Sequence, residues 1–494
     1  MSVPHAAKLG FSVSVINRFA SRAGSAAQSL WEASGQLVQP SLRLGVTGLA
    51  RSGKTVFTTA LVHHLVRGTT LPAFRPSGEG RIRRAILAHQ PDDAVPRFPF
   101  EMHLEALTVE RRWPQSTNRI SELRIDIEYE RRAGWRSGPA SLALDIVDYP
   151  GEWLLDLALL DAGYAAWSRQ TLAASARPDR RTIAAPWRES LGALDADGPA
   201  DELLAARAAE SFKAYLASLR AGPEAVATTP PGRFLMPGDL AGSPALTFAP
   251  LDLPVGQAIR PGSFAALMER RFEAYKTHVV RPFFRDHFQR IDRQIVLVDV
   301  LAAIDAGPLA LAELEESLDQ VLMAFRIGRN TLLSRLFSPR ADRVLFAATK
   351  ADHVHHTDHD RLDAILRLLV NRATRRTEAA GARVGTVALA SVRATRETTI
   401  REGRETLRAV AGVPEAGERI GGEVFDGQAE AAIFPGELPQ SAEAVFQGAV
   451  PPGSLRFPRF RPPVVPLDAA GRLGRLPHIR FDRALEFLLG DRLA

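Results

Sequence analysis

Runs of apolar residues along the chain predict a β-sheet whose strands are separated by helices. Leu42–Thr47 is mostly apolar, and a glycine-rich loop follows it. Apolar residues then recur at three- and four-residue spacing over Lys54–Val66, which predicts a helix. Three later runs are almost continuously apolar, as is typical of strands buried on both faces of a parallel sheet. These runs are Gln294–Val300, Arg343–Ala348 and Val384–Leu389.

Two further segments predict an antiparallel hairpin. Glu122–Glu130 alternates apolar and polar residues with period two, and Leu142–Asp148 is a second strand-like run. The loop between them contains Gly134 and Gly138, as expected for a hairpin connection. Ahead of the hairpin, the pattern of Gly78–Ala88 predicts a short helix with arginines on its outer face. The predicted fold class is therefore α/β, with a mostly parallel sheet and one antiparallel hairpin strand.

The loop after the first strand fits the phosphate-binding pattern G-x-x-x-x-G-K-[ST] at every fixed position. We expect Gly48 and Gly53 to turn the backbone with positive φ, so that N–H groups and the helix start face phosphate oxygens. Lys54 would bridge the β- and γ-phosphates, and the Thr55 hydroxyl would bind Mg²⁺. The predicted phosphate-binding segment also includes Arg51, Ser52 and Val56.

An acidic residue ends the second strand of the hairpin. Asp148 stands where P-loop enzymes carry the carboxylate that holds the Mg²⁺ shell. The sequence Asp-Tyr-Pro-Gly that begins there would bring the Gly151 N–H to the γ-phosphate, so that this loop senses whether the phosphate is present. An ordinary strand-to-turn sequence is the alternative interpretation.

Composition narrows the classes of function. Lys and Arg total 62 against 56 Asp and Glu in 494 residues, without a dense basic block, so nucleic acid is not a predicted partner. The absence of cysteine excludes disulfides, thiol nucleophiles and cysteine-ligated zinc. No apolar run reaches the roughly eighteen residues of a transmembrane helix, and no N-terminal signal is seen, so we expect a cytoplasmic protein.

The periodicity changes along the chain and predicts its division. The pattern is mostly helical from Trp153 to about Phe288, and glycine and proline become dense beyond about Thr406. The predicted parts are an N-terminal helical arm (1–40), a nucleotide-binding domain in two pieces (41–152 and 291–405), a helical insertion (153–290), and a small β-containing appendage with a terminal helix (406–494). The arm is expected to pack on the body of the protein, and contact with a membrane surface is the alternative.

Two loops predict which base is bound. Thr349-Lys350-Ala351-Asp352 resembles the [NT]-K-x-D motif of GTPases. An aspartate can accept hydrogen bonds from N1–H and the 2-amino group of guanine, which adenine does not offer, and the Lys350 stem can lie over the ring. The residues Ala390, Ser391 and Val392 resemble the loop whose N–H groups approach guanine O6. If Lys350 and Asp352 are ordinary surface residues, the alternative is an ATPase with the same P-loop.

The motifs together resemble the bacterial YcjX-like family of P-loop NTPases. The resemblance covers nearly the whole chain and rests on VTGLARSGKTVFTTALVHHL, DYPGEW, TKADHVH, ASVRATRE and FDRALEFLLGDRL. It implies a cytosolic, Ras-like GTPase domain with a helical insertion and a link to stress responses, although older labels of the family say ATPase. Carried over by the resemblance are Ser52, Gly53, Lys54 and Thr55 for phosphate, and Lys350, Asp352, His353 and Ala390–Val392 for the base.

Two further positions complete the predicted GTPase site, and the second differs from the common pattern. A threonine ahead of the hairpin should close over Mg²⁺ and the γ-phosphate, and Thr117 is our choice, with an ordinary strand-entry threonine as the alternative. Glu152 occupies the place where many GTPases carry a glutamine that orients water, so hydrolysis is expected to be slow. The residues near Thr117 that we include as nucleotide contacts are Trp113, Ser116 and Arg119. The candidates for an internal arginine finger are Arg111, Arg112 and Arg119.

Four histidines follow the base motif, at positions 353, 355, 356 and 359. We interpret His353 as a base contact and Asp358 as a cap at a helix start, and a zinc site is the alternative.

The sequence thus predicts a Mg²⁺-dependent GTP-binding protein that hydrolyses GTP and acts as a nucleotide-controlled switch on a protein effector. The predicted catalytic residues are Lys54, Thr117, Gly151 and Glu152, and the predicted metal ligands are Thr55, Thr117 and Asp148. A nucleotide-gated binding protein with negligible turnover is a further alternative.

Overall fold

The computed structural model describes residues 39–49, 51–115, 119–132, 137–221, 230–235, 237, 240–256, 258–324, 341–378 and 382–494. The chain divides into two units, Met1–Pro40 and Ser41–Ala494. Nearly all of the first unit, and with it the predicted N-terminal arm, lies outside the described residues. All elements named below belong to the second unit.

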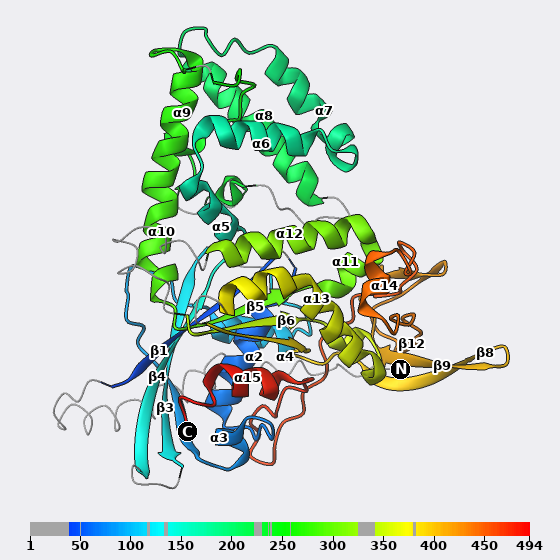
Figure 1. Cartoon of the computed structure of the whole chain (residues 1–494). Helices are drawn as coiled ribbons and strands as arrows, with labels where there is room; N and C mark the ends of the chain where they lie inside the picture. Colours follow the sequence, from blue (N-terminus) through cyan, green and yellow to red (C-terminus); the bar gives the residue numbers. More distant parts are fainter. Residues whose placement is uncertain are drawn as a thin grey trace, which may run out of the picture. The chain divides into compact units, whose positions relative to one another are not determined.

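A seven-stranded sheet forms the centre of this unit, in the order β2-β3-β4-β1-β5-β6-β7 (Figure 1). The strands β4, β1, β5, β6 and β7 are parallel to one another, whereas β3 pairs antiparallel with both of its neighbours, β2 and β4. Their bounds are β1 Ser41–Gly48, β2 Ile82–Ala88, β3 Ser121–Arg131, β4 Gly138–Asp148, β5 Arg293–Val298, β6 Arg343–Ala348 and β7 Arg383–Ala388. The predicted α/β class with a mostly parallel sheet is confirmed.

The first edge strand, β2, corrects the prediction of a helix over Gly78–Ala88. Only the short α3 (Arg75–Gly78) is helical, and Ile82–Ala88 pairs with β3 through a register shift between Ile82 and Arg84. A seven-residue segment is too short for helical periodicity to be decisive, and the open edge of β3 offers it backbone hydrogen bonds.

Two hydrophobic cores cover the two faces of the sheet. Along β5, Ile295 and Leu297 contribute to one core while Val296 and Val298 contribute to the other, as the strand period of two requires. The first core is closed by α2 (Lys54–Arg67), α4 (Phe100–Thr108) and α15 (Phe481–Leu489). The second is closed by α11 (Val300–Ala306), α12 (Pro308–Ala324) and α13 (His359–Glu378).

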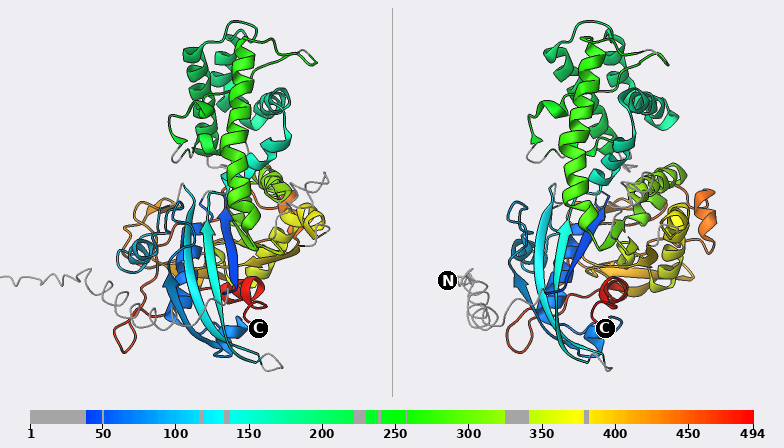
Figure 2. Two further views of the ribbon diagram at one scale, coloured as in Figure 1. Left: turned by 90° about the vertical axis from the view of Figure 1, so that its left-hand side faces the viewer. Right: turned by 60° about the vertical axis from the view of Figure 1, so that its left-hand side comes forward.

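The chain between β4 and β5 is helical (Figure 2). Aromatic side chains form its interior: Trp167 stacks on Phe272 at 5.0 Å, and Trp187 stacks on Tyr215 at 4.7 Å between ring centroids. The main helices are α5 Glu152–Leu155, α6 Tyr164–Ser175, α7 Pro178–Gly192, α8 Glu202–Ala221, α9 Phe264–Tyr275 and α10 Arg281–Asp286, with a π-helical turn at Lys276–Val280 between the last two. Across the described part of the chain, none of the helices is long and apolar enough to cross a membrane.

The C-terminal part contains a three-stranded antiparallel sheet in the order β12-β9-β8. The strands β8 (Arg396–Glu402) and β9 (Glu405–Gly412) form a hairpin, so they span the predicted domain boundary at residue 405. The smaller elements are β10 Arg419–Ile420, β11 Glu423–Val424, β12 Ala431–Ile433 and α14 Ala442–Phe446. From here the chain returns through α15 to the central sheet (Figure 1).

Candidate functional site

The glycine loop joins β1 to α2. Among the described residues of the loop, Arg51 (φ 61°) and Gly53 (φ 82°) are left-handed. Gly48 is not among them, so the expectation of a positive φ there is wrong. It must be glycine because a Cβ atom would lie 2.4 Å from both the Leu297 carbonyl oxygen and Ser52 Oγ. Gly48 is therefore fixed by close packing against β5, whereas Gly53 provides the turn that starts α2.

Two side chains of the loop have geometry suited to a polyanion. The Lys54 ammonium donates to Gly48 O at 2.7 Å and is held inside the loop, with only 7% of the residue exposed. Ser52 Oγ is buried and has no hydrogen-bond partner among the described residues. A buried hydroxyl without a partner is costly, and a phosphate oxygen would satisfy it. The residues present thus fit a bound phosphate chain.

The Asp-Tyr-Pro-Gly segment lies directly against the glycine loop. Asp148 ends β4 opposite Val46 of β1 and is fully buried. Three residues on, a Cβ atom on Gly151 would lie 2.5 Å from Gly48 O, so only glycine allows this approach. The sheet register thereby places both motifs at the carboxyl ends of adjacent parallel strands, where α/β proteins bind ligands.

A pocket of about 460 Å³ unites the phosphate and base motifs. Such a volume is within the usual range for small-molecule sites. Its walls come from six short stretches that are far apart in sequence. They are residues 51–56 of the glycine loop, residues 112–115 ahead of β3, the two base loops (Thr349, Lys350, Asp352, His353 and Ala390–Val392), and Glu415, Arg459 and Phe460.

The predicted residues ahead of β3 differ in outcome. Ser116 and Thr117 lie outside the described residues, and Arg119 is exposed and does not line the pocket. Of the three candidate finger arginines, Arg112 is the one that lines it. The neighbouring Gln115 does reach the glycine loop, since its carbonyl oxygen is 3.5 Å from Thr55 Oγ1.

Glu152 does not line the pocket and pairs instead with an arginine of the helical segment. Its carboxylate accepts a hydrogen bond from Arg220 Nη2 at 2.6 Å, and only 5% of the residue is exposed. Arg220 belongs to α8, so the residue after Gly151 connects the loop to the helical segment between β4 and β5.

The base end of the pocket is held by backbone contacts. Asp352 is 5% exposed, and its Oδ2 accepts from the Ala394 N–H at 2.8 Å. The second base loop is fixed by a bridge in which the Ala390 N–H donates to Ile479 O at 3.0 Å. His353 packs on Phe460 with 5.6 Å between ring centroids, and burial lowers its pKa below the ordinary value of 6.5. Its ring is therefore uncharged at neutral pH.

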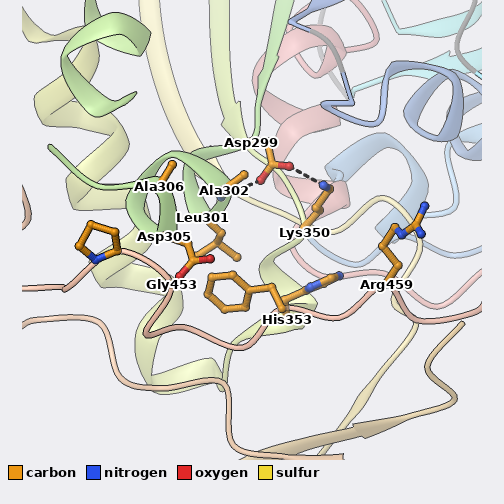
Figure 3. A pocket seen from close by; sticks show the side chains of 11 residues that line it. Asp299, Leu301, Ala302, Asp305, Ala306, Lys350, His353, Gly453 and Arg459 are labelled. Atoms are coloured by element: carbon orange, nitrogen blue, oxygen red, sulfur yellow. Dashed lines mark hydrogen bonds and ion pairs between the residues drawn. The ribbon is translucent and has the colours of Figure 1, made fainter. Parts of the chain in front are cut away.

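Sequence reasoning missed Asp299, which lies beside the base loop. The predicted strand Gln294–Val300 ends earlier, at Val298, and Asp299 caps α11 by accepting from the Ala302 N–H at 3.2 Å. Its other oxygen pairs with the Lys350 ammonium, as Figure 3 shows. Asp299 directly follows a buried strand, as the other motifs of the site do, and this position could have identified it as a site residue.

A second pocket of about 500 Å³ adjoins the first (Figure 3). The two share Lys350, His353 and Arg459, and the second is bounded on its other side by Asp299 and Asp305 of the α11 region. The Lys350 ammonium is thus turned toward this second pocket, while Asp352 lines the first.

The sequence analysis also assigned no role to the stretch that contains Phe460 and Pro462, which we call the C-terminal segment. Trp113 Nε1 donates to Phe460 O at 2.6 Å, and Arg111 Nε donates to Pro462 O at 3.1 Å. Phe460 is itself buried against Val410 and Ile433 of the C-terminal sheet. This segment therefore joins the region before β3 to the C-terminal sheet, and no local motif marks it.

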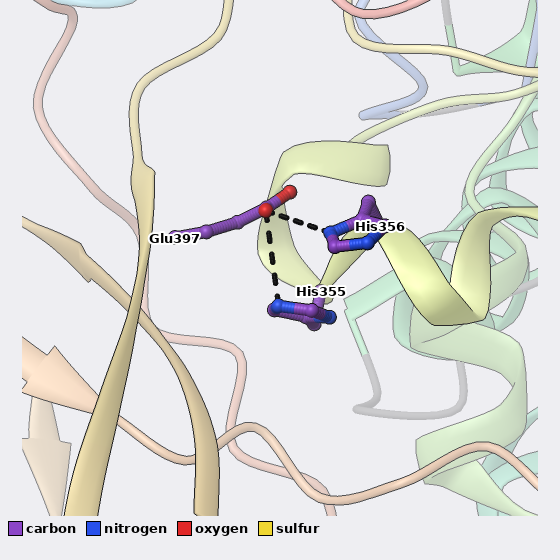
Figure 4. A group of neighbouring side chains, drawn as sticks. All are labelled: His355, His356 and Glu397. Atoms are coloured by element: carbon purple, nitrogen blue, oxygen red, sulfur yellow. Dashed lines mark hydrogen bonds and ion pairs between the residues drawn. The ribbon is translucent and has the colours of Figure 1, made fainter.

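The four histidines after the base motif do not form one cluster. His353 faces the pocket, and His359 Nε2 lies 2.8 Å from Ala351 O. Asp358, which directly precedes α13, accepts from Arg361 at 2.7 Å. The remaining two, His355 and His356, meet Glu397 of β8 (Figure 4).

Comparison with known proteins agrees with the motifs. The model of the YcjX-like family matches residues 42–493. A protein of Escherichia coli (strain K12) named Ras-like GTPase YcjX is 37% identical over 466 residues, which cover 92% of this chain and 96% of that protein. A protein of Shewanella oneidensis with the same name is 33% identical over 482 residues, covering 92% of this chain and 94% of the relative. The chain therefore belongs to the YcjX-like family.

Proposed function

We propose that this protein binds guanine nucleotides and hydrolyses GTP as a nucleotide-controlled switch. The observation that carries the proposal is the 460 Å³ pocket in which the glycine loop and both base loops face the same space. The names of the two relatives support the same class of activity. A pocket lined by the glycine loop at one end and by Asp352 at the other suits a purine nucleotide.

Guanine selectivity is assigned to Asp352. Its carboxylate is nearly buried and fixed by the Ala394 N–H, so an adenine base would leave part of it without a partner. Discrimination by a site built to hydrogen-bond a donor is strong, because the wrong ligand leaves a buried polar group unpaired.

The phosphate end fits a nucleotide that carries Mg²⁺. The Thr55 hydroxyl faces the pocket, and the buried carboxylate of Asp148 ends the adjacent strand. These two residues and Thr117 would hold the ion. A bound Mg²⁺ would neutralise the charge that develops on the phosphates.

The roles of the chain's own residues follow from their positions. Lys54 stabilises charge on the transferred phosphoryl group, and Gly151 lies close enough to the loop for its backbone to respond to the γ-phosphate. Because Glu152 pairs with Arg220, a movement of Gly151 reaches α8 through a single ion pair. We propose this as the route from nucleotide state to a protein effector. Three points stay predictions. They are the assignment of residues 153–290 and 406–494 as separate parts of the protein, the cytoplasmic location and the effector.

A titration with fluorescent GDP and ADP in Mg²⁺ tests the base assignment. Wild type should prefer GDP, and Asp352→Asn should lose most of that preference because the amide cannot accept two hydrogen bonds from guanine. Asp360→Asn is the matched control, since Asp360 is 87% exposed and pairs with Arg480 away from the pocket. Equal binding of ADP, unchanged in Asp352→Asn, would mean an ATPase whose base site lies elsewhere.

A second candidate, a nucleotide-gated binding protein with negligible turnover, is favoured by the geometry of Glu152. The residue at the position that orients water in many GTPases does not line the pocket and pairs with Arg220. A single-turnover rate equal to that of GTP in solution, with tight GDP binding retained, would select this candidate over hydrolysis.

A further inference from the structure

A group of three metal-binding side chains lies outside the nucleotide pocket. His355 and His356 come from the loop between β6 and α13, and Glu397 comes from β8, forty-one residues after His356. One ligand atom from each residue lies within 4.8 Å of the others. Figure 4 shows both imidazole rings directed at one carboxylate oxygen. The nucleotide proposal gives these residues no role.

The distances are close to those of a tetrahedral metal centre. Zinc bonds of about 2.0–2.1 Å to nitrogen and oxygen place neighbouring ligand atoms about 3.3 Å apart. Here Glu397 Oε2 lies 3.7 Å from His355 Nε2 and 2.7 Å from His356 Nδ1. Small rotations of the three side chains, which move the ligand atoms by about half an ångström, would bring both distances close to the value for zinc. We propose that His355, His356 and Glu397 bind a divalent ion of the Zn²⁺ class, with water at the fourth position.

The surroundings orient two of the ligands. His355 Nδ1 accepts from the Thr357 backbone N–H at 3.4 Å and lies 3.1 Å from Thr357 Oγ1, so these contacts hold the ring with its Nε2 toward Glu397. Arg393 lies 3.7 Å from the other oxygen, Glu397 Oε1, which leaves Oε2 for the ion. Two imidazoles and one carboxylate are ligands that zinc commonly takes when a coordination position stays open.

The ion would join two segments that already support Asp352. The two histidines lie three and four residues after Asp352. Glu397 lies three residues after Ala394, whose N–H donates to the Asp352 carboxylate. A metal bridge between the loop and β8 would therefore brace this loop, as metals commonly do between distant segments.

Calorimetric titration of ZnCl₂ into the untagged, full-length protein without nucleotide tests the site. We expect one ion per chain, with affinity reduced at least about tenfold in both His356→Ala and Glu397→Gln, because even outer-shell partners commonly contribute that much. The control is His278→Ala, since His278 is an exposed histidine of the helical segment, and it should bind like wild type. Absorption spectra with Co²⁺ should show the intense bands of a tetrahedral site, and these should be absent in Glu397→Gln.

His356 is 62% exposed, so His356→Ala is expected to fold normally, and its melting temperature without metal checks this. The absence of saturable one-to-one binding in wild type would overturn the proposal. Equal affinity in His356→Ala and His278→Ala would overturn it as well. Neither readout involves a nucleotide, so a failed metal titration is distinct from a failure of the proposed GTPase.

Discussion

The two ends of the nucleotide pocket are built in different ways. The phosphate end is formed by residues 51–56 of one continuous strand-loop-helix segment. The base end is assembled from two strand-end loops together with Arg459 and Phe460, which follow them by more than sixty residues. Its parts are held by contacts between distant segments, such as the Asp352–Ala394 and Ala390–Ile479 hydrogen bonds.

This difference suggests a division of roles. The phosphate end should supply most of the affinity and the charge stabilisation, because a local loop can be held rigidly by its own helix and strand. The base end should supply selectivity and communication, because its walls belong to several elements that can move relative to one another.

Replacing Lys54 should give the largest effect. Lys54→Ala removes the ammonium held at Gly48 O, and we expect GTP hydrolysis to fall by about 10²–10³-fold, as for other preorganised charge-stabilising groups. The preference for GDP over ADP should survive in whatever binding remains, because Asp352 is untouched. Phosphate release and competition titrations measure the two quantities. Loss of selectivity together with hydrolysis would contradict the division of roles. Arg285→Ala, at a residue whose side chain is 71% exposed, is the control.

Gly48→Ala should lower the stability of the protein, because the added methyl group overpacks the contact between β1 and β5. The added methyl group would meet Leu297 O at 2.4 Å, so we expect about 1–3 kcal/mol of destabilisation from overpacking. Gly192→Ala is the control because its Cβ atom would meet nothing within 4 Å, so this variant should not be destabilised by packing. Urea unfolding compares the two variants. If both change stability by the same amount, the close approach of Gly48 to β5 is not what requires glycine.

The same difference explains how much could be predicted from the sequence. The central strands, Gly53, Lys54 and the base loops carry patterns that short-range physics imposes, so their predicted positions agree with the sheet and the pocket. The Trp113–Phe460 hydrogen bond and the Lys350–Asp299 pair depend on tertiary packing and carry no local pattern. The β2 edge strand shows the same limit, because pairing with β3 decided its conformation. Gly48 ends β1, where close packing against β5 and not a positive φ requires glycine, so the predicted physical reason was wrong.

Acidification should weaken the base end. Burial lowers the folded-state pKa of His353 below 6.5, whereas the unfolded chain keeps the ordinary value. The unfolded state therefore binds more protons below pH 6.5, and the stability contributed by neutral His353 is present above that pH and lost as the pH falls. The loss is at most about 1.4 kcal/mol per pH unit. In His353→Gln, both the free energy of unfolding and the affinity for GDP should change less between pH 7 and pH 5.5 than in wild type. Identical pH profiles for the two proteins would exclude a role for this histidine.

The smallest expected effect concerns the link between the two ends. Trp113→Phe keeps an aromatic ring but removes the donor to Phe460 O, a hydrogen bond with a net value of about 0.5–1.5 kcal/mol. If this bond ties the segment before β3 to the C-terminal segment, GDP should dissociate about two- to tenfold faster from the variant. Trp187→Phe makes the same change in the helical segment, where Trp187 Nε1 has no hydrogen-bond partner among the described residues, so GDP dissociation there should match wild type. Stopped-flow displacement of fluorescent GDP measures both rates. Equal rates in Trp113→Phe and wild type would show that the C-terminal segment closes the pocket without controlling release, and the communication assigned to the base end would then have to pass through the Glu152–Arg220 ion pair instead.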